Sequence, residues 1–161
     1  MLEIHDLGLC DAEKMLQLNN AHALETSLLD QAGLSSLLRH AFYCRGIDHG
    51  AAALLIALDQ HAQYENPNFN WFRKRYRAFV YVDRVIVADF VRGQGLARRL
   101  YLDLFTKARH NGHNRIVCEI NIDPPNPASD AFHLAMGFSA VGQAVIHNGK
   151  KEVRYFELIL T

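Results

Sequence analysis

The chain has 161 residues, which suffice for one substantial hydrophobic core but not for two, so we expect a single domain over residues 1–161. Its 17 lysine and arginine residues balance 17 aspartate and glutamate residues, and this neutral charge argues against a nucleic-acid or membrane partner. The N-terminus lacks the basic and apolar regions of a signal peptide, and no stretch reaches the ~20 apolar residues of a membrane span. We therefore expect a cytoplasmic protein.

The first part of the sequence predicts two helices between short strands. In chain order these elements are a strand at 2–4, a helix at 11–23, a helix from Ser27 or Asp30 to about 41, and strands at 42–47 and 51–58. The last two strands flank a turn and form a hairpin. A long polar and aromatic segment with one short helix follows at 59–77.

The second part of the sequence alternates strands and helices more regularly. Valine, isoleucine and aromatic residues crowd both faces of 79–88, which is typical of a central strand. The remaining elements are a helix at 95–110, a strand at 115–121, a helix at 128–136 and strands at 138–146 and 152–160. The nine histidines are scattered without ligand spacing, so we expect no metal site.

Two glycines stand where the central strand turns into the next helix, in the stretch Arg92-Gly93-Gln94-Gly95. Unpaired backbone N–H groups at a helix N-terminus suit a phosphate, glycines allow close approach, and the arginines add positive charge. The alternative is a glycine turn with solvated arginines. A dinucleotide fingerprint is disfavoured because it needs a small residue where Arg98 stands, and the lysine of a P-loop is missing.

The stretch Arg92 to Ala97 fits the R/Q-x-x-G-x-G/A motif of the GCN5-related N-acetyltransferase (GNAT) superfamily, and Asn126 to Phe138 resembles its second motif helix. The order of predicted elements also resembles that superfamily, and the chain is similar to a bacterial subgroup of predicted acetyltransferases. The resemblance implies an α/β (α+β) fold. We expect a mixed, mostly antiparallel sheet of about seven strands with helices on both faces, in which the fourth and fifth strands splay apart.

The same resemblance implies acetyl-CoA as cofactor, with CoA as product. The loop and helix start would hold the diphosphate through Arg92, Gly93, Gln94, Gly95, Leu96, Ala97 and Arg98. Backbone N–H groups of Val85 and Val87 would face the acetyl carbonyl and the pantetheine arm. Asn126 would contact that arm and also cap its own helix.

Acetyl transfer needs a neutral amine and benefits from a proton donor at the departing thiolate. Glu119 and Asp83 are the candidate bases, and each has a structural alternative as an ion-pair partner of a basic side chain. His133 stands where the superfamily has its acid tyrosine. An imidazolium there could protonate the thiolate, or His133 could contact the acceptor or simply pack in its helix.

The acceptor side is predicted from the segment between the hairpin and the central strand. Tyr64, Phe69 and Trp71 are candidate lining residues of the acceptor pocket, or they pack on the core. Aromatic and basic residues interleave over 64–77, which also permits an RNA-binding module.

The sequence thus predicts an acyltransferase that moves an acetyl group from acetyl-CoA to a primary amine of a small molecule or a peptide or protein N-terminus, by direct attack in a ternary complex. The alternative from another class is a non-catalytic CoA-binding or interaction protein of the same fold that has lost the acid. The two terminal strands also allow a homodimer.

Overall fold

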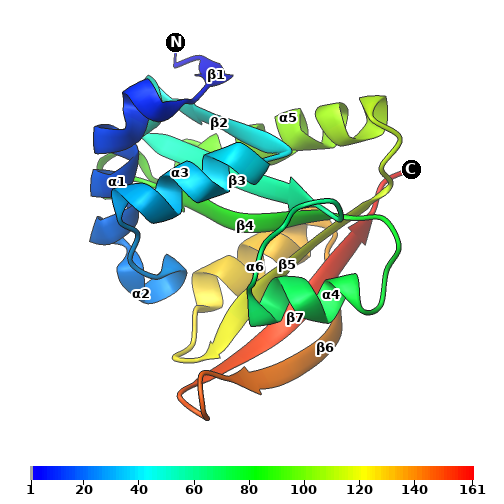
Figure 1. The fold of residues 1–161 in the computed structure, drawn as a ribbon. Coiled ribbons are helices and arrows are strands. Elements are labelled where there is room, and N and C mark those ends of the chain that lie inside the picture. Colours follow the sequence, from blue (N-terminus) through cyan, green and yellow to red (C-terminus); the bar gives the residue numbers. More distant parts are fainter. Residues whose placement is uncertain (1) are drawn as a thin grey trace.

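The computed structural model of the protein describes residues 2–161 and is built around a seven-stranded sheet (Figure 1). The strands follow the order β1-β2-β3-β4-β5-β7-β6, and β4 and β5 are the parallel pair in an otherwise antiparallel sheet. They are β1 Ile4–Asp6, β2 Tyr43–Ile47, β3 Ala53–Asp59, β4 Val80–Val87, β5 Arg115–Asp123, β6 Ser139–Ile146 and β7 Lys151–Ile159. The predicted fold class is confirmed.

Helices cover both faces of the sheet. In Figure 1, α1, α3 and α4 lie in front of it, and α5 and α6 lie behind it. The helices are α1 Ala12–Ala21, α2 Ala23–Thr26, α3 Gln31–His40, α4 Pro67–Arg73, α5 Leu96–His110 and α6 Pro127–Met136. Their ends follow local sequence: the Asp30 side chain accepts a hydrogen bond from Gly33 N at 2.7 Å and caps α3.

The core fills the space on each side of the sheet. Behind the sheet, Leu100, Tyr101 and Leu104 of α5 are fully buried against the strands. In front, Phe69 and Phe72 of α4 pack in a second cluster with Tyr81, Tyr155 and the buried valines of β5 and β7. This burial accounts for the mixed hydrophobic pattern of β4, whose first residues are apolar on both faces.

Two predictions near the N-terminus are wrong in their bounds. The first strand lies at Ile4–Asp6 rather than 2–4, where it pairs with β2. The helix predicted over 11–23 ends at Ala21, and the short helix α2 follows after a break at His22. No helix within residues 2–161 has the length and apolar character needed to cross a membrane.

Candidate active site

The site begins where β4 and β5 separate. The two strands pair only at Val80–Ile116 and Tyr81–Val117, although both continue for several residues. Beyond that point the sheet is open between them. The Ala88 N–H donates to Ala52 O at 2.9 Å, on the β3 side of the strand. Because successive N–H groups of a strand point to opposite sides, the N–H groups of Val85 and Val87 point towards the opening.

The loop after β4 leads into α5 through two glycines in left-handed conformation. Gly93 has φ +81° and Gly95 has φ +75°, and the space next to each Cα is open for 4 Å. Gly95 is the N-cap of α5 and offers no side chain to the first N–H groups of the helix. These N–H groups and the positive end of a 15-residue helix therefore face an open cradle.

A channel of about 440 Å³, here called the outer channel, runs along this cradle to the start of α6. All the residues that the sequence predicted to bind cofactor line it except Gln94. They are Val85, Val87, Arg92, Gly93, Gly95, Leu96, Ala97, Arg98 and Asn126. Asn126 also caps α6, because its side chain accepts from Ser129 N at 3.3 Å.

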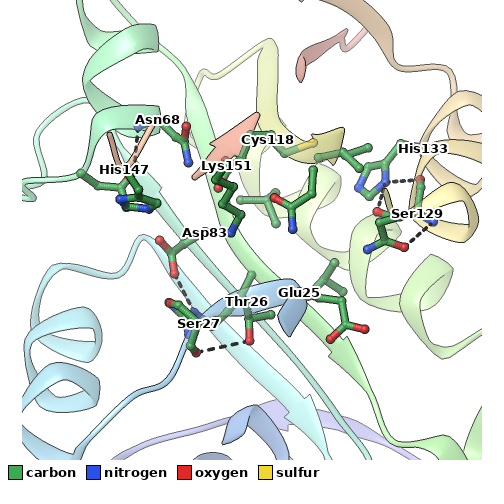
Figure 2. A pocket seen from close by; sticks show the side chains of 18 of the residues that line it. Glu25, Thr26, Ser27, Asn68, Asp83, Cys118, Ser129, His133, His147 and Lys151 are labelled. Atoms are coloured by element: carbon green, nitrogen blue, oxygen red, sulfur yellow. Dashed lines mark hydrogen bonds and ion pairs between the residues drawn. The ribbon is translucent and has the colours of Figure 1, made fainter. Parts of the chain in front are cut away.

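A second, smaller cavity of about 140 Å³, here called the inner cavity, adjoins the outer channel (Figure 2). Val85, Asn126 and His133 line both spaces, so they mark the junction. Tyr64 and Glu119 belong to the front of the sheet and Tyr101 to the back, yet all line the inner cavity. The cavity therefore passes through the opening between β4 and β5.

The sequence matches the model of the acetyltransferase (GNAT) family over residues 51–138, more than half of the chain. The chain belongs to this family. The match covers the splayed strands, the glycine loop and both motif helices. No curated protein matches the chain significantly.

Solved structures show the same fold at low sequence identity. Ard1 from Thermoplasma volcanium has a TM-score of 0.77 at 14% identity, over 99% of this chain and 98% of its own. The structure of NAA60 from Arabidopsis thaliana, determined with a bisubstrate analogue, has a TM-score of 0.76 at 11% identity and covers 100% of this chain and 99% of its own. The structure of yncA from Salmonella typhimurium, determined with its cofactor acetyl-CoA, has a TM-score of 0.72 at 18% identity and covers 100% of this chain and 95% of its own.

GNAT enzymes use acetyl-CoA, and the outer channel fits that cofactor. A Cβ at Gly93 or Gly95 would narrow the cradle and require a backbone conformation that L-residues rarely adopt. The exposed side chain of Arg98 adds positive charge beside the N–H groups of α5. Among residues 2–161, no group of three or more histidine, cysteine, aspartate or glutamate side chains is placed to hold a metal ion.

Glu119 lies in the inner cavity on the front face of β5. The Tyr81 hydroxyl is 2.9 Å from Oε1 and 2.8 Å from Oε2, and it donates to this carboxylate. Burial raises the pKa of Glu119 from 4.5 to about 7, although the Tyr81 hydrogen bond opposes this shift. A carboxyl with this pKa can take up and release a proton near neutral pH.

Asp83 also lines the inner cavity, but its oxygens already have partners. Oδ1 accepts from the Tyr64 hydroxyl at 2.7 Å, and Oδ2 accepts from Arg84 Nε at 2.7 Å. Arg84 is itself buried and reaches Asn19 Oδ1 at 2.6 Å. The ion-pair alternative weighed for Asp83 is therefore present in the structure, and Glu119 is the freer of the two carboxyls.

His133 lies at the junction with a defined tautomer. Nδ1 is 2.8 Å from the carbonyl oxygen of Ser129, which can only accept, so Nδ1 carries the hydrogen. Nε2 is then an acceptor, and it lies 2.7 Å from the Tyr101 hydroxyl, which donates to it. Burial lowers the pKa of His133 below its ordinary value. This environment argues against the predicted imidazolium acid, because the ring is neutral at neutral pH.

Two of the three predicted acceptor residues lie elsewhere. Tyr64 lines the inner cavity, but Phe69 is fully buried in the front core, and the Trp71 ring stacks on Tyr155 at 4.2 Å between centroids. The helical period of α4 turns its aromatic residues towards the core, so only Tyr64, which precedes the helix, reaches the cavity. Arg75 of this segment is also engaged, because its guanidinium lies 3.7 Å from the Trp71 ring centroid.

Several cavity residues were not identified from the sequence. Tyr101 reads as one more core position on the buried face of α5, and only its contact with His133 distinguishes it. Asn68 and Lys151 line the inner cavity from α4 and β7, which lie far apart in the sequence. Glu25 of α2 lines both spaces, and its approach depends on the break at His22 that separates α2 from α1.

Proposed function

We propose that residues 1–161 form a single acetyltransferase domain that transfers an acetyl group from acetyl-CoA to a primary amine by direct attack in a ternary complex. The observation that carries the proposal is Glu119, a carboxyl with a pKa of about 7 in a cavity that adjoins the outer channel. The acceptor amine belongs either to a small molecule or to a peptide N-terminus.

Bound acetyl-CoA supplies the reactive thioester, and the protein supplies proton transfer and charge stabilisation. Glu119 accepts a proton from the acceptor ammonium and leaves a neutral amine that can attack. The Tyr81 hydroxyl holds the carboxylate in place. The N–H groups of Val85 and Val87 are available to stabilise negative charge on the carbonyl oxygen, as donors that need no reorganisation.

Tyr101 is the proposed hydrogen-bond donor at the leaving sulfur, and its single hydroxyl hydrogen would turn from His133 Nε2 to the sulfur as negative charge develops there. Its hydroxyl lies in the inner cavity 2.7 Å from Nε2 of the junction residue His133, whereas the hydrogen on His133 Nδ1 is held by Ser129 O. Burial raises the pKa of Tyr101 well above its ordinary value, so the hydroxyl keeps its proton at neutral pH. Before that step His133 Nε2 accepts this hydrogen and holds the hydroxyl in place, so His133 is a positioning residue rather than the acid.

Calorimetric titration with acetyl-CoA tests the foundation of this proposal. Wild type should bind, and Gly95→Asp should not, because aspartate adds bulk and negative charge where the diphosphate would lie. Gly112→Asp is the matched control, since Gly112 is also left-handed with open space at its Cα but lies after the end of α5. Equal loss of binding in both variants would point to misfolding, and binding by Gly95→Asp would contradict the cradle.

The non-catalytic alternative is favoured by one observation, the neutral histidine at position 133. It predicts acetyl-CoA binding without release of CoA in the presence of any amine. A thiol-release assay over a panel of amines and peptides separates the two functions, because the enzyme turns over at least one member and a binding protein turns over none.

A further inference from the structure

The end of the inner cavity remote from the outer channel has its own set of polar groups. In Figure 2 the cavity extends from His133 and Ser129 past Lys151 to Asn68 and His147. His147 lies in the connection between β6 and β7, and Lys151 begins β7. The Lys151 charge is near enough to Glu119 to lower the pKa of that carboxyl, so this end adjoins the proposed base and would meet the part of an acceptor that does not react.

Asn68 presents hydrogen-bond donors to this end. Its side chain is 6% exposed, and its Oδ1 accepts from the buried Tyr155 hydroxyl at 2.8 Å. This bond fixes the orientation of the amide and leaves the Nδ2 hydrogens facing the cavity. Within residues 2–161, Nδ2 has no hydrogen-bond partner. Nδ2 is reached from the cavity rather than enclosed in the core, so its hydrogens are free to donate to an acceptor atom of a ligand.

Lys151 brings positive charge to the same end. Its side chain points into the cavity in Figure 2, and no carboxylate of the described residues lies within 4.0 Å of its Nζ. Lys151 and Tyr155 are four residues apart on β7, so they share one face of the strand. Asp83 does not neutralise Lys151, because Arg84 and Tyr64 take both of its oxygens.

The size of the inner cavity limits the acceptor. A volume of about 140 Å³ is well below the ~300–1,000 Å³ of pockets that hold drug-sized ligands. Only a small molecule, or the tip of a larger one, fits. The N-terminal residue of a peptide has its α-carboxyl group converted to an uncharged amide, so its backbone offers Lys151 no anion.

We propose that the acceptor is a small amine that also carries a carboxylate, with its amine at Glu119 and its carboxylate against Lys151 Nζ and Asn68 Nδ2. This inference rests on the proposed acetyl transfer and specifies its substrate class. An ammonium and a carboxylate on one small molecule complement the negative charge of Glu119 and the positive charge of Lys151, which line the same cavity.

The test compares each amino acid with its own carboxamide as acceptor, using acetyl-CoA and thiol release. The series contains the α-amino acids and linear ω-amino acids of increasing length, which vary the separation of the two charged groups. For the preferred compound, wild type should favour the acid over the amide by about 10- to 100-fold in kcat/KM, because a charge-assisted hydrogen bond is lost in the amide.

Two variants assign this preference to the remote end. Lys151→Met keeps the length and apolar stem of the side chain but removes its charge, so the acid-to-amide ratio should fall close to one. Asn68→Asp keeps an oxygen for Tyr155 and adds a negative charge, so the ratio should fall below one. Lys150→Met is the control, since Lys150 is exposed in the turn before β7 and should keep the wild-type ratio. The ratio is taken within one preparation, so a loss of folded protein cancels.

The outcomes separate the two proposals. Wild type that acetylates amides or peptide N-termini as well as free acids would overturn the carboxylate inference and leave the acetyltransferase standing. An acid preference that survives Lys151→Met and Asn68→Asp would also overturn it. If acetyl-CoA binds but no acid, amide or peptide is acetylated, the proposed function fails and the inference fails with it.

Discussion

Replacing Glu119 with glutamine keeps the size and one hydrogen-bonding oxygen of the side chain but removes its ability to take up a proton. Loss of a positioned general base typically costs 10²–10⁴-fold in rate, so we expect kcat to fall by about that factor. Wild-type kcat should rise with pH through about 7, because only ionised Glu119 can accept the proton of the ammonium. The residual activity of the variant should lack this inflection.

The same substitution should stabilise the folded protein at high pH. The folded-state pKa of Glu119 is raised from 4.5 to about 7, so between these values the folded state binds more protons than the unfolded state. Stability contributed by this group is therefore complete below pH 4.5 and is lost as the pH rises through about 7. The difference between the two pKa values corresponds to about 3 kcal/mol above pH 7, and glutamine does not incur this cost.

Urea unfolding at pH 8 and at pH 4.5 measures this effect. Glu119→Gln should exceed wild type in free energy of unfolding by about 3 kcal/mol at pH 8 and by little at pH 4.5. Glu157→Gln is the matched control, because Glu157 of β7 pairs with Arg115 at 3.1 Å away from the cavity and should lose at most about 1 kcal/mol. Wild-type turnover by Glu119→Gln, or equal stability of the two proteins at pH 8, would refute the assignment of Glu119 as a buried base.

Two further substitutions test the surroundings of the site. Tyr101→Phe removes the hydroxyl that donates to His133 Nε2, and it should lower kcat about tenfold or more and the free energy of unfolding by about 1 kcal/mol. Tyr43→Phe is the control: it removes a buried hydroxyl bonded to Asp103, so it should cost similar stability and leave kcat unchanged. Equal kcat values for the two variants would contradict the role of Tyr101. Gly142→Ala should lower the free energy of unfolding in urea by about 1–3 kcal/mol, because the new Cβ would lie 2.8 Å from Cη2 of the stacked Trp71. Gly8→Ala is the control, since a Cβ there meets open space and should change stability little. Equal stability of the two glycine variants would contradict this packing.

Local patterns were sufficient to predict most of the fold. The apolar run that became β4 and the leucine spacing of α5 placed both elements within about a residue of their observed bounds, because these signals come from neighbouring positions. The break between α1 and α2 was missed because no glycine or proline marks it. Side chains fix it from within α1: Asn19 Nδ2 donates to Ser27 O at 2.8 Å, and Asn20 Oδ1 accepts from Leu29 N at 3.0 Å.

The cradle and the inner cavity differ in how far the sequence could predict them. The cradle is a contiguous stretch, so Arg92 to Arg98 could be predicted from one motif. The inner cavity is assembled from side chains of α4, α5, β4, β5 and β7, and only the fold brings them together. Aromatic composition alone suggested Phe69 and Trp71, but the helical phase of α4 decides that they pack in the core.

The protonation state of His133 could not be predicted from the sequence. The sequence identifies the histidine, but its neutral tautomer depends on Ser129 O and on a hydroxyl from α5. Tyr101 follows Gly95 by six residues, so its Cα lies about 9 Å along the helix axis from the cradle. One helix carries both the proposed phosphate-binding N-terminus and Tyr101, so α5 sets the separation between the cradle and the hydroxyl that contacts His133. The cradle and the junction therefore both depend on the placement of the same helix.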